Sequence, residues 1–133
     1  MSAEDPRFAL VRDAFDSFEA RDVEGVAAFL HPEVESRVFP PLLNTGTWQG
    51  YAGFVQMTSG WESAFGSIRY DERGMEALDD RHVLVAVHQT ATGAGSGVPV
   101  ELDVFFLIEF EGEQVIRFQI HASRESAVAA TSS

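Results

Sequence analysis

The four histidines are the first side chains to weigh for chemistry, because an imidazole can move protons or bind metals near neutral pH. His31 precedes Pro32, where a predicted helix must stop, so we interpret it as structural. His82 and His88 share a strand face about 20 Å apart, at ~3.3 Å per residue, too far to share an ion. His121 also falls on an outer strand face. Without H-x-x-x-H spacing or a facial carboxylate cluster, the sequence predicts no metal site.

Missing residue types exclude several other chemistries. The chain contains no Cys, and its nine basic residues are all Arg. Without Cys there is no disulfide, thiolate nucleophile or Cys-ligated metal. Without Lys there is no Schiff base, no lysine-anchored pyridoxal phosphate and no P-loop lysine. The sequence therefore predicts no cofactor.

A glycine cluster, Gly93, Gly95 and Gly97, is the next candidate, because phosphate-binding loops are rich in glycine. Such loops join a strand to a helix, whose N-terminus faces the anion. Here the glycines join two predicted strands, so we interpret the segment as a hairpin turn.

The net charge of −12 restricts the partners. This charge disfavours nucleic acids and anionic membranes, which attract the opposite sign. Residues 1–6 lack the basic and apolar regions of a signal peptide, and no apolar run approaches the ~20 residues of a membrane helix. We expect a cytoplasmic protein with no nucleic-acid or membrane partner.

Apolar spacing and turn residues define the elements that must position a site. Asp5 caps a first helix, Asp22 opens a second that Pro32 ends, and Gly74 marks a bulge in a strand. Ser123 caps a short last helix. After the first two helices, the predicted elements are a strand over 34–38, an irregular loop over 42–49, a helix over 51–65, strands over 68–78, 81–92, 98–110 and 114–122, and a helix over 123–130.

Strand alternation indicates which side chains face the helices. The inner rows are Leu102, Val104, Phe106, Ile108 and Phe110; Val83, Val85, Val87 and Gln89; and Ile116, Phe118 and Ile120. Phe105 and Leu107 fall on the outer face, which suggests a second burial surface, most simply a homodimer. The order of elements predicts a single α+β domain over 1–133, with an ordered core over about 5–130 and helices on one face of an antiparallel sheet.

Several segments resemble the SnoaL-like proteins of the nuclear-transport-factor-2-like superfamily, which includes ketosteroid isomerases. They are residues 15–22, 29–35, Trp48-Gln49-Gly50, 95–101, 112–118 and 123–127, in the same order along nearly the whole chain. The resemblance implies a cystatin-like α+β barrel, that is, a cone-shaped, curved, mixed or antiparallel sheet wrapped by three helices of the N-terminal half, with a short C-terminal helix. It also implies a ligand pocket at the mouth of the cone and frequent dimers through the outer face.

The resemblance transfers no known catalytic set to this chain. The acid and base residues of ketosteroid isomerases match Ala14, Val38 and Phe106. The Arg and two Asp of limonene-type epoxide hydrolases match Val87, Gln89 and Ile120, and their water-orienting Tyr and Asn match Ser36 and Val38. The acidic residue of SnoaL-type cyclases also matches Ile120. None of these side chains titrates, so the matching acid–base functions are absent at these positions.

The remaining pocket candidates are aromatic or inner polar residues. Phe39, Trp48, Tyr51 and Trp61 surround the loop and third helix that flank the pocket mouth in this family; core packing is favoured for Trp61, and both core and pocket stay open for Trp48 and Tyr51. A buried Gln needs hydrogen-bond partners from a ligand, water or backbone. The full set of candidates is Ser36, Val38, Phe39, Trp48, Tyr51, Trp61, Val87, Gln89, Phe106 and Ile120.

These residues predict binding of a small hydrophobic molecule in an apolar pocket, with the reaction left open. One alternative is an isomerase, hydrolase or polyketide-cyclase-type enzyme with a non-standard acid or base. Another is a non-catalytic dimerisation or association domain. A pocket of a few hundred cubic ångströms with an inward carboxylate or His favours an enzyme, whereas a filled cone with a large exposed apolar sheet face favours association.

Overall fold

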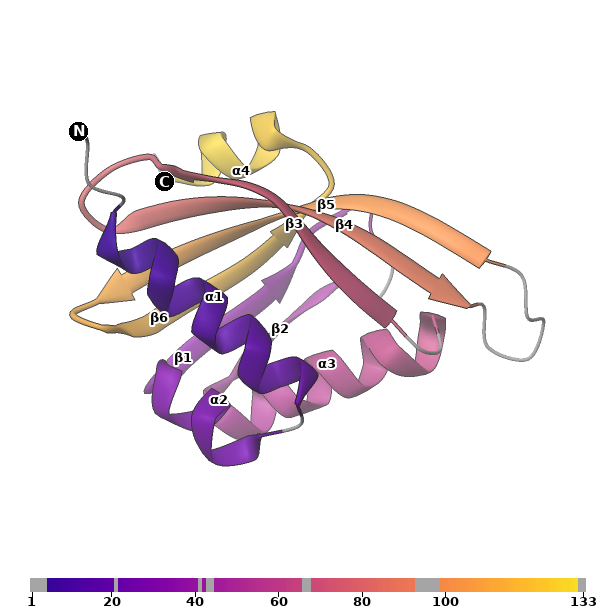
Figure 1. The fold of residues 1–133 in the computed structure, drawn as a ribbon, viewed down its shortest axis with the longest axis horizontal. Coiled ribbons are helices and arrows are strands. Elements are labelled where there is room, and N and C mark those ends of the chain that lie inside the picture. Colours follow the sequence, from indigo (N-terminus) through magenta and orange to yellow (C-terminus); the bar gives the residue numbers. More distant parts are fainter. Residues whose placement is uncertain are drawn as a thin grey trace.

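The computed structural model describes residues 5–20, 22–40, 42, 45–65, 68–92 and 99–131. Its elements are α1 (Pro6–Glu19), α2 (Val23–Phe29), β1 (Leu30–Val38), β2 (Gly46–Gln49), α3 (Gly50–Phe65), β3 (Ile68–Ala77), β4 (His82–Thr92), β5 (Pro99–Glu111), β6 (Gln114–His121) and α4 (Arg124–Ala130). Figure 1 shows α1, α2 and α3 on one side of the sheet and α4 on the other. The α+β class predicted from the sequence is confirmed.

The strands of the described residues form one open sheet in the order β2-β1-β6-β5-β4-β3. The four strands from β3 to β6 are antiparallel neighbours in chain order, so they form a meander, which agrees with the four successive strands of an antiparallel sheet predicted from the sequence. Strand β1 pairs parallel to β6, so the sheet is mixed. Because β2 and β3 remain at its two edges, this sheet does not close into a barrel.

Capping side chains fix where three helices begin. Asp5, Asp22 and Ser123 each accept a backbone N–H from the first turn of their helix, at 2.9, 3.1 and 3.1 Å. Pro6 fills the first position of α1, where its missing N–H has no partner to lose. These helix starts agree with the sequence prediction.

The main core lies between α1–α3 and the inner face of the sheet. Val34, Val83 and Val104 are fully buried there. Aromatic rings join the layers, since Phe15 of α1 packs edge-on against Phe106 of β5 with ring centroids 5.9 Å apart. The helices therefore reach the sheet through large rings, and the space between these rings is where a ligand chamber can form.

The second helix ends earlier than Pro32, contrary to the sequence prediction. Helix α2 stops at Phe29, and β1 begins at Leu30, which pairs with Val115 of β6. His31 therefore lies at the start of a strand, where its Nδ1 accepts the N–H of Glu33 at 3.0 Å. The ladder to β6 is irregular between Leu30 and Glu35, and a proline without an N–H is tolerated at such an interruption.

The segment predicted as a loop over 42–49 contains β2, which pairs antiparallel with β1 and sets Trp48 opposite Ser36. The sequence did not reveal it because four residues carry too little alternation. Helix α3 approaches this strand so closely that a Cβ at Gly53 would lie 2.9 Å from the Cβ of Trp48. Glycine at position 53 is therefore required by packing, although it weakens the helix.

The inner row of β6 also differs from the prediction at one residue. The register of β5 and β6 shifts between Glu109 and Phe110, so that Phe110 pairs with Val115. Val115 is buried in the core, whereas Ile116, which was expected there, is partly exposed. A bulge adds one residue to the strand and reverses the side-chain alternation beyond it.

The outer face of the sheet carries a second apolar cluster under α4. Leu84, Leu107 and Ala127 are buried together, and Phe105 packs against them. Phe105 and Leu107 thus lie on the outer face as predicted, but helix α4 of the same chain covers them. The homodimer that these two residues suggested stays a prediction.

Candidate functional site

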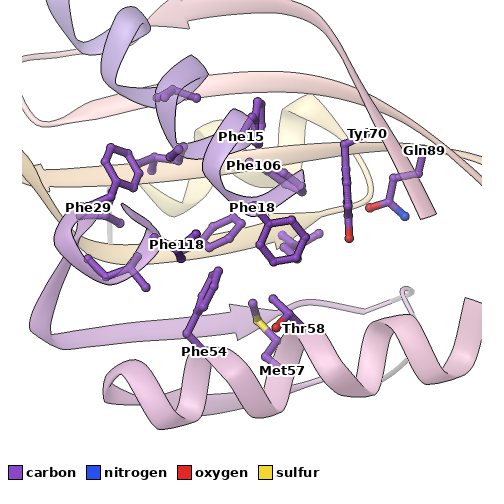
Figure 2. Close-up of a pocket in the computed structure, with 17 residues that line it drawn as sticks. Phe15, Phe18, Phe29, Phe54, Met57, Thr58, Tyr70, Gln89, Phe106 and Phe118 are labelled. Atoms are coloured by element: carbon purple, nitrogen blue, oxygen red, sulfur yellow. The ribbon is translucent and has the colours of Figure 1, made fainter. Parts of the chain in front are cut away.

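A chamber of about 80 Å³ lies between the helices and the inner face of the sheet. Figure 2 shows its 17 lining residues, with aromatic rings on most sides. They are Val11, Ala14, Phe15, Phe18, Val26, Phe29, Leu30, Phe54, Met57, Thr58, Tyr70, Gln89, Phe106, Ile108, Val115, Phe118 and Ile120. The lining is overwhelmingly apolar, so water in the chamber would find few partners.

Helical spacing turns one face of α1 and one face of α3 toward the chamber. Ala14 and Phe18 of α1 are four residues apart and therefore share a face. Phe54 and Thr58 of α3 are related in the same way and face them from below in Figure 2. Ala14 has the smallest side chain of the lining residues, so the space in front of it stays open.

The floor of the chamber is a set of aromatic rings on the sheet. The ring of Phe106 lies 5.0 Å from that of Phe118, edge to face, and 6.4 Å from that of Tyr70. Phe18 lies 5.8 Å from Tyr70 and 6.4 Å from Phe54, edge-on in both cases. Interlocked rings hold each other's orientation, so the chamber has defined walls.

Three polar side chains are present among the lining residues: Thr58, Tyr70 and Gln89. Gln89 is 2% exposed, and Tyr70 stands directly opposite it on the neighbouring strand. Figure 2 shows Tyr70 and Gln89 together at one end of the chamber and Phe29 at the other. Two of the three polar side chains therefore lie at one end of the chamber, the third, Thr58, lies beside Met57 on α3, and none of the lining residues is a carboxylate, His or Arg.

Three of the ten predicted site residues line this chamber. Gln89 and Phe106 do so from β4 and β5, and Ile120 does so from β6. Ala14, which matches a catalytic tyrosine of ketosteroid isomerases, also lines it.

The other predicted residues are placed elsewhere. Ser36, Val38 and Val87 are buried in the inner layer without lining the chamber, and Trp48 and Tyr51 pack against that core from its side. Trp61 belongs to α3, but its side chain falls outside the described part of the chain. Phe39 lies on the outer face, stacked on His121.

Ser36 is unusual among these buried residues. Its side chain is 0% exposed, and its Oγ has no hydrogen-bond partner among the described residues. Its neighbours across the sheet are Trp48 and Phe118. A hydroxyl buried in this way costs stability unless something supplies a hydrogen bond.

Sequence reasoning missed Phe18, Phe54, Thr58 and Tyr70 as lining residues. Tyr70 had a usable signal, because the predicted strands over 68–78 and 81–92 follow one another, and pairing them places Tyr70 on the face of Gln89 once the register is known. Phe18 and Phe54 fall in segments that the apolar spacing predicts as helices, but their facing a cavity rather than a filled core depends on tertiary packing.

The histidines lie away from the chamber. His82 and His88 sit on the outer face of β4, as predicted, with a ring nitrogen 3.0 Å from Asp79 and 2.7 Å from Asp103 respectively. Hydrogen bonds that the ring of His88 donates, first to Asp103 and then to Glu101, raise the pKa of His88. Among the described residues, no three His, Asp or Glu side chains come close enough to hold an ion together.

His121 is buried beneath α4 on the outer face. Its Nδ1 lies 2.7 Å from the Oγ of Ser126 on that helix, and its Nε2 lies 2.8 Å from the Oε1 of Gln119. Burial lowers the pKa of His121 to about 4, and the nearby charge of Arg37 adds to the effect. The ring is therefore neutral near pH 7 and connects the last helix to the sheet.

The chamber is small by the standard of ligand pockets, which usually span roughly 300–1,000 Å³. A space of about 80 Å³ accommodates one small ring or a short aliphatic chain. It offers apolar contact on most sides and hydrogen bonding at one end. Separately, no helix of the described residues has the length and hydropathy needed to cross a bilayer.

Comparisons with known proteins agree with this architecture. The sequence profile of the SnoaL-like domain matches residues 11–118. No curated protein matches the sequence significantly.

Solved structures match over nearly the full chain at low identity. One is an NTF2-like protein of unknown function from Burkholderia pseudomallei, with a TM-score of 0.78, 19% identity, and coverage of 95% of this chain and 97% of that one. Another is TerC, co-crystallised with polyporic acid, with a TM-score of 0.78, 19% identity, and coverage of 97% and 100%.

A third, assigned as a SnoaL-like polyketide cyclase, comes from Jannaschia sp. CCS1, with a TM-score of 0.76, 16% identity, and coverage of 100% and 99%. At these identities the structural matches establish the fold alone. The sequence profile, which spans most of the chain, establishes more than the fold: this chain belongs to the SnoaL-like domain family.

Proposed function

We propose that this protein binds a small hydrophobic molecule in the chamber between α1, α3 and the sheet. The observation that carries the proposal is the lining itself, in which 17 residues surround the space and only Thr58, Tyr70 and Gln89 are polar. Apolar surface transferred from water into such a space gains about 2.5 kcal/mol per 100 Å². The bound molecule needs no charge, because the lining offers none.

The chamber supports binding better than turnover. Among its lining residues, Tyr70 carries the one titratable proton, and no carboxylate or His stands ready to accept a proton from a substrate. The residues at the positions of known family catalysts remain apolar or amide, as in Ala14, Gln89 and Ile120. One structure of the same fold is assigned as a SnoaL-like polyketide cyclase, so ring-shaped molecules are the first ligands to test.

Benzene and toluene test the proposal directly, since each carries one ring and no polar group. Their titration into the labelled protein is followed by methyl NMR. We expect the methyl signals of Met57, Val115 and Ile120, which line the chamber, to shift with saturation.

The protein contains its own control for this titration. Leu84 and Leu107 are equally buried, but they lie in the cluster under α4 on the other face of the sheet. Their methyl signals should stay in place. Shifts at Leu84 and Leu107 alone, or no saturable shift at the chamber methyls, would overturn the proposal.

A further inference from the structure

A second, polar hollow adjoins the apolar chamber. Its volume is about 580 Å³, and it opens at the edge of the sheet where β3 lies. Two residues line both hollows, Phe18 and Tyr70. The other residues of this hollow, which we call the vestibule, are Glu19, Ile68, Arg69, Asp71 and Thr90.

The rings of Phe18 and Tyr70 form the partition between the two hollows. Phe18 stands in the last turn of α1 and Tyr70 near the start of β3. Their centroids are 5.8 Å apart and their planes are inclined at 80°, which is contact distance for an edge-to-face pair. In Figure 2 the two rings stand beside each other on the side of the chamber where Gln89 lies. A carbon skeleton that passes between these two rings therefore needs one of them to rotate.

The charges of the vestibule disfavour an anionic ligand. Its described lining has two carboxylates, Glu19 and Asp71, and one guanidinium, Arg69, and Asp71 is also paired with Arg73 at 3.1 Å. The whole chain carries a net charge of −12, so its surroundings are negative as well. A polar group that is neutral or positively charged is therefore favoured in this hollow.

We infer that the natural ligand is an amphipathic molecule. Its apolar body occupies the chamber, its neutral or cationic polar end stays in the vestibule, and Phe18 and Tyr70 select it by size as it passes. This inference rests on the proposed function, because it assigns a ligand class to the same chamber. One molecule thus spans the partition, with its apolar part in the chamber and its polar part in the vestibule.

Two substitutions distinguish the effect of opening the partition from the effect of merely enlarging the chamber. Phe18→Leu removes ring atoms at the partition. Phe29→Leu is the matched control, since Phe29 lines the chamber but not the vestibule and also packs edge-on, against Phe110 at 6.0 Å. Figure 2 places Phe29 at the opposite end of the chamber from Tyr70.

Benzene and n-butylbenzene are the first probes, titrated by methyl NMR into both variants and the wild type. We expect Phe18→Leu to bind n-butylbenzene about tenfold more tightly than Phe29→Leu does, because the butyl chain gains room for about two methylene groups toward the vestibule. Benzene should bind the wild type and both variants. Equal gains in the two variants would overturn the role of the partition while leaving the proposed function intact, whereas failure of benzene to bind the wild type would refute the proposed function itself.

The charge of the polar end is tested on the wild-type protein, so the test does not depend on a variant folding. The probes are 2-phenylethylammonium, 2-phenylethanol and 3-phenylpropanoate at low ionic strength. We expect the ammonium to bind tightest and the carboxylate weakest, by roughly two- to fivefold, with the difference shrinking as salt is added. Tightest binding by the carboxylate would overturn the assignment of the vestibule.

Discussion

Filling the chamber from α1 is the most direct perturbation of the site. Ala14 lines the chamber, and Ala14→Leu adds three carbon atoms where about 80 Å³ is open. Empty volume in a core costs about 24 cal/mol per Å³, so abolishing this chamber is worth up to about 1.9 kcal/mol. We therefore expect Ala14→Leu to raise the free energy of unfolding by as much as about 2 kcal/mol and to abolish benzene binding.

The same substitution on the exposed side of α1 is the control. Ala9 is exposed on this helix, so Ala9→Leu has the same change in helix propensity without filling the chamber. Urea unfolding of both variants and the wild type gives the midpoint and the slope, and an unchanged slope assigns the shift to stability. Ala9→Leu should leave both stability and benzene binding near the wild-type values.

Two results would refute this reasoning. If Ala14→Leu were less stable than Ala9→Leu by more than about 1 kcal/mol, the added atoms would be meeting a packed core rather than open space. If Ala14→Leu bound benzene as the wild type does, the ligand would occupy some other place.

Four further predictions concern stability. Ser36→Ala should stabilise the protein by about 1 kcal/mol in urea, because it removes an unpartnered buried hydroxyl; a loss of stability would reveal a partner for that oxygen. Gly53→Ala should destabilise it by about 1–3 kcal/mol despite the better helix propensity, because the new Cβ meets Trp48 at 2.9 Å; a more stable variant would contradict that packing. His121 has a folded-state pKa of about 4, below its unfolded value, so the unfolded state binds the proton first. The free energy of unfolding should therefore fall as the pH drops from about 6.5 to about 4. His121→Asn should flatten this part of the profile of urea midpoint against pH, and a slope identical to that of the wild type would refute the assignment. His88 has a raised folded-state pKa, so the stability that it adds to the folded protein is complete below about pH 6.5 and is lost as the pH rises through that raised value. The urea midpoint of His88→Gln should therefore differ from that of the wild type most at low pH. A difference independent of pH would count against this prediction.

Local signals in the sequence were sufficient for most of the fold. Asp5, Asp22 and Ser123 mark helix starts through their own side chains, and the glycine at position 74 falls at the β3 register shift between Glu72 and Gly74. The inner position of Gln89 followed from simple alternation along one strand. Each of these features depends on residues that are close in sequence.

The errors occurred where distant pairing decides the outcome. Leu30 becomes a strand residue because Val115, 85 positions later, pairs with it, and no local pattern shows this. The shift between Glu109 and Phe110 exchanges Ile116 for Val115 in the core, because one bulge reverses alternation. The chamber walls at Phe18 and Tyr70 required the rotation of α1 against the sheet, which depends on packing rather than on spacing.

The parallel pairing of β1 with β6 has a consequence for the order in which the protein can acquire its structure. Strand β1 leaves the ribosome well before β6, its inner neighbour in the sheet, because five other elements lie between them along the chain. Until then, β1 has only the short strand β2 to pair with, and the apolar faces of α1 and α3 have no complete floor. Until β6 has been made, the emerging chain therefore carries unsatisfied strand edges and exposed aromatic rings, and contacts of such long sequence separation form slowly. The sheet and the floor of the chamber can therefore be completed only after β6 has been made, whatever the order in which the earlier elements form.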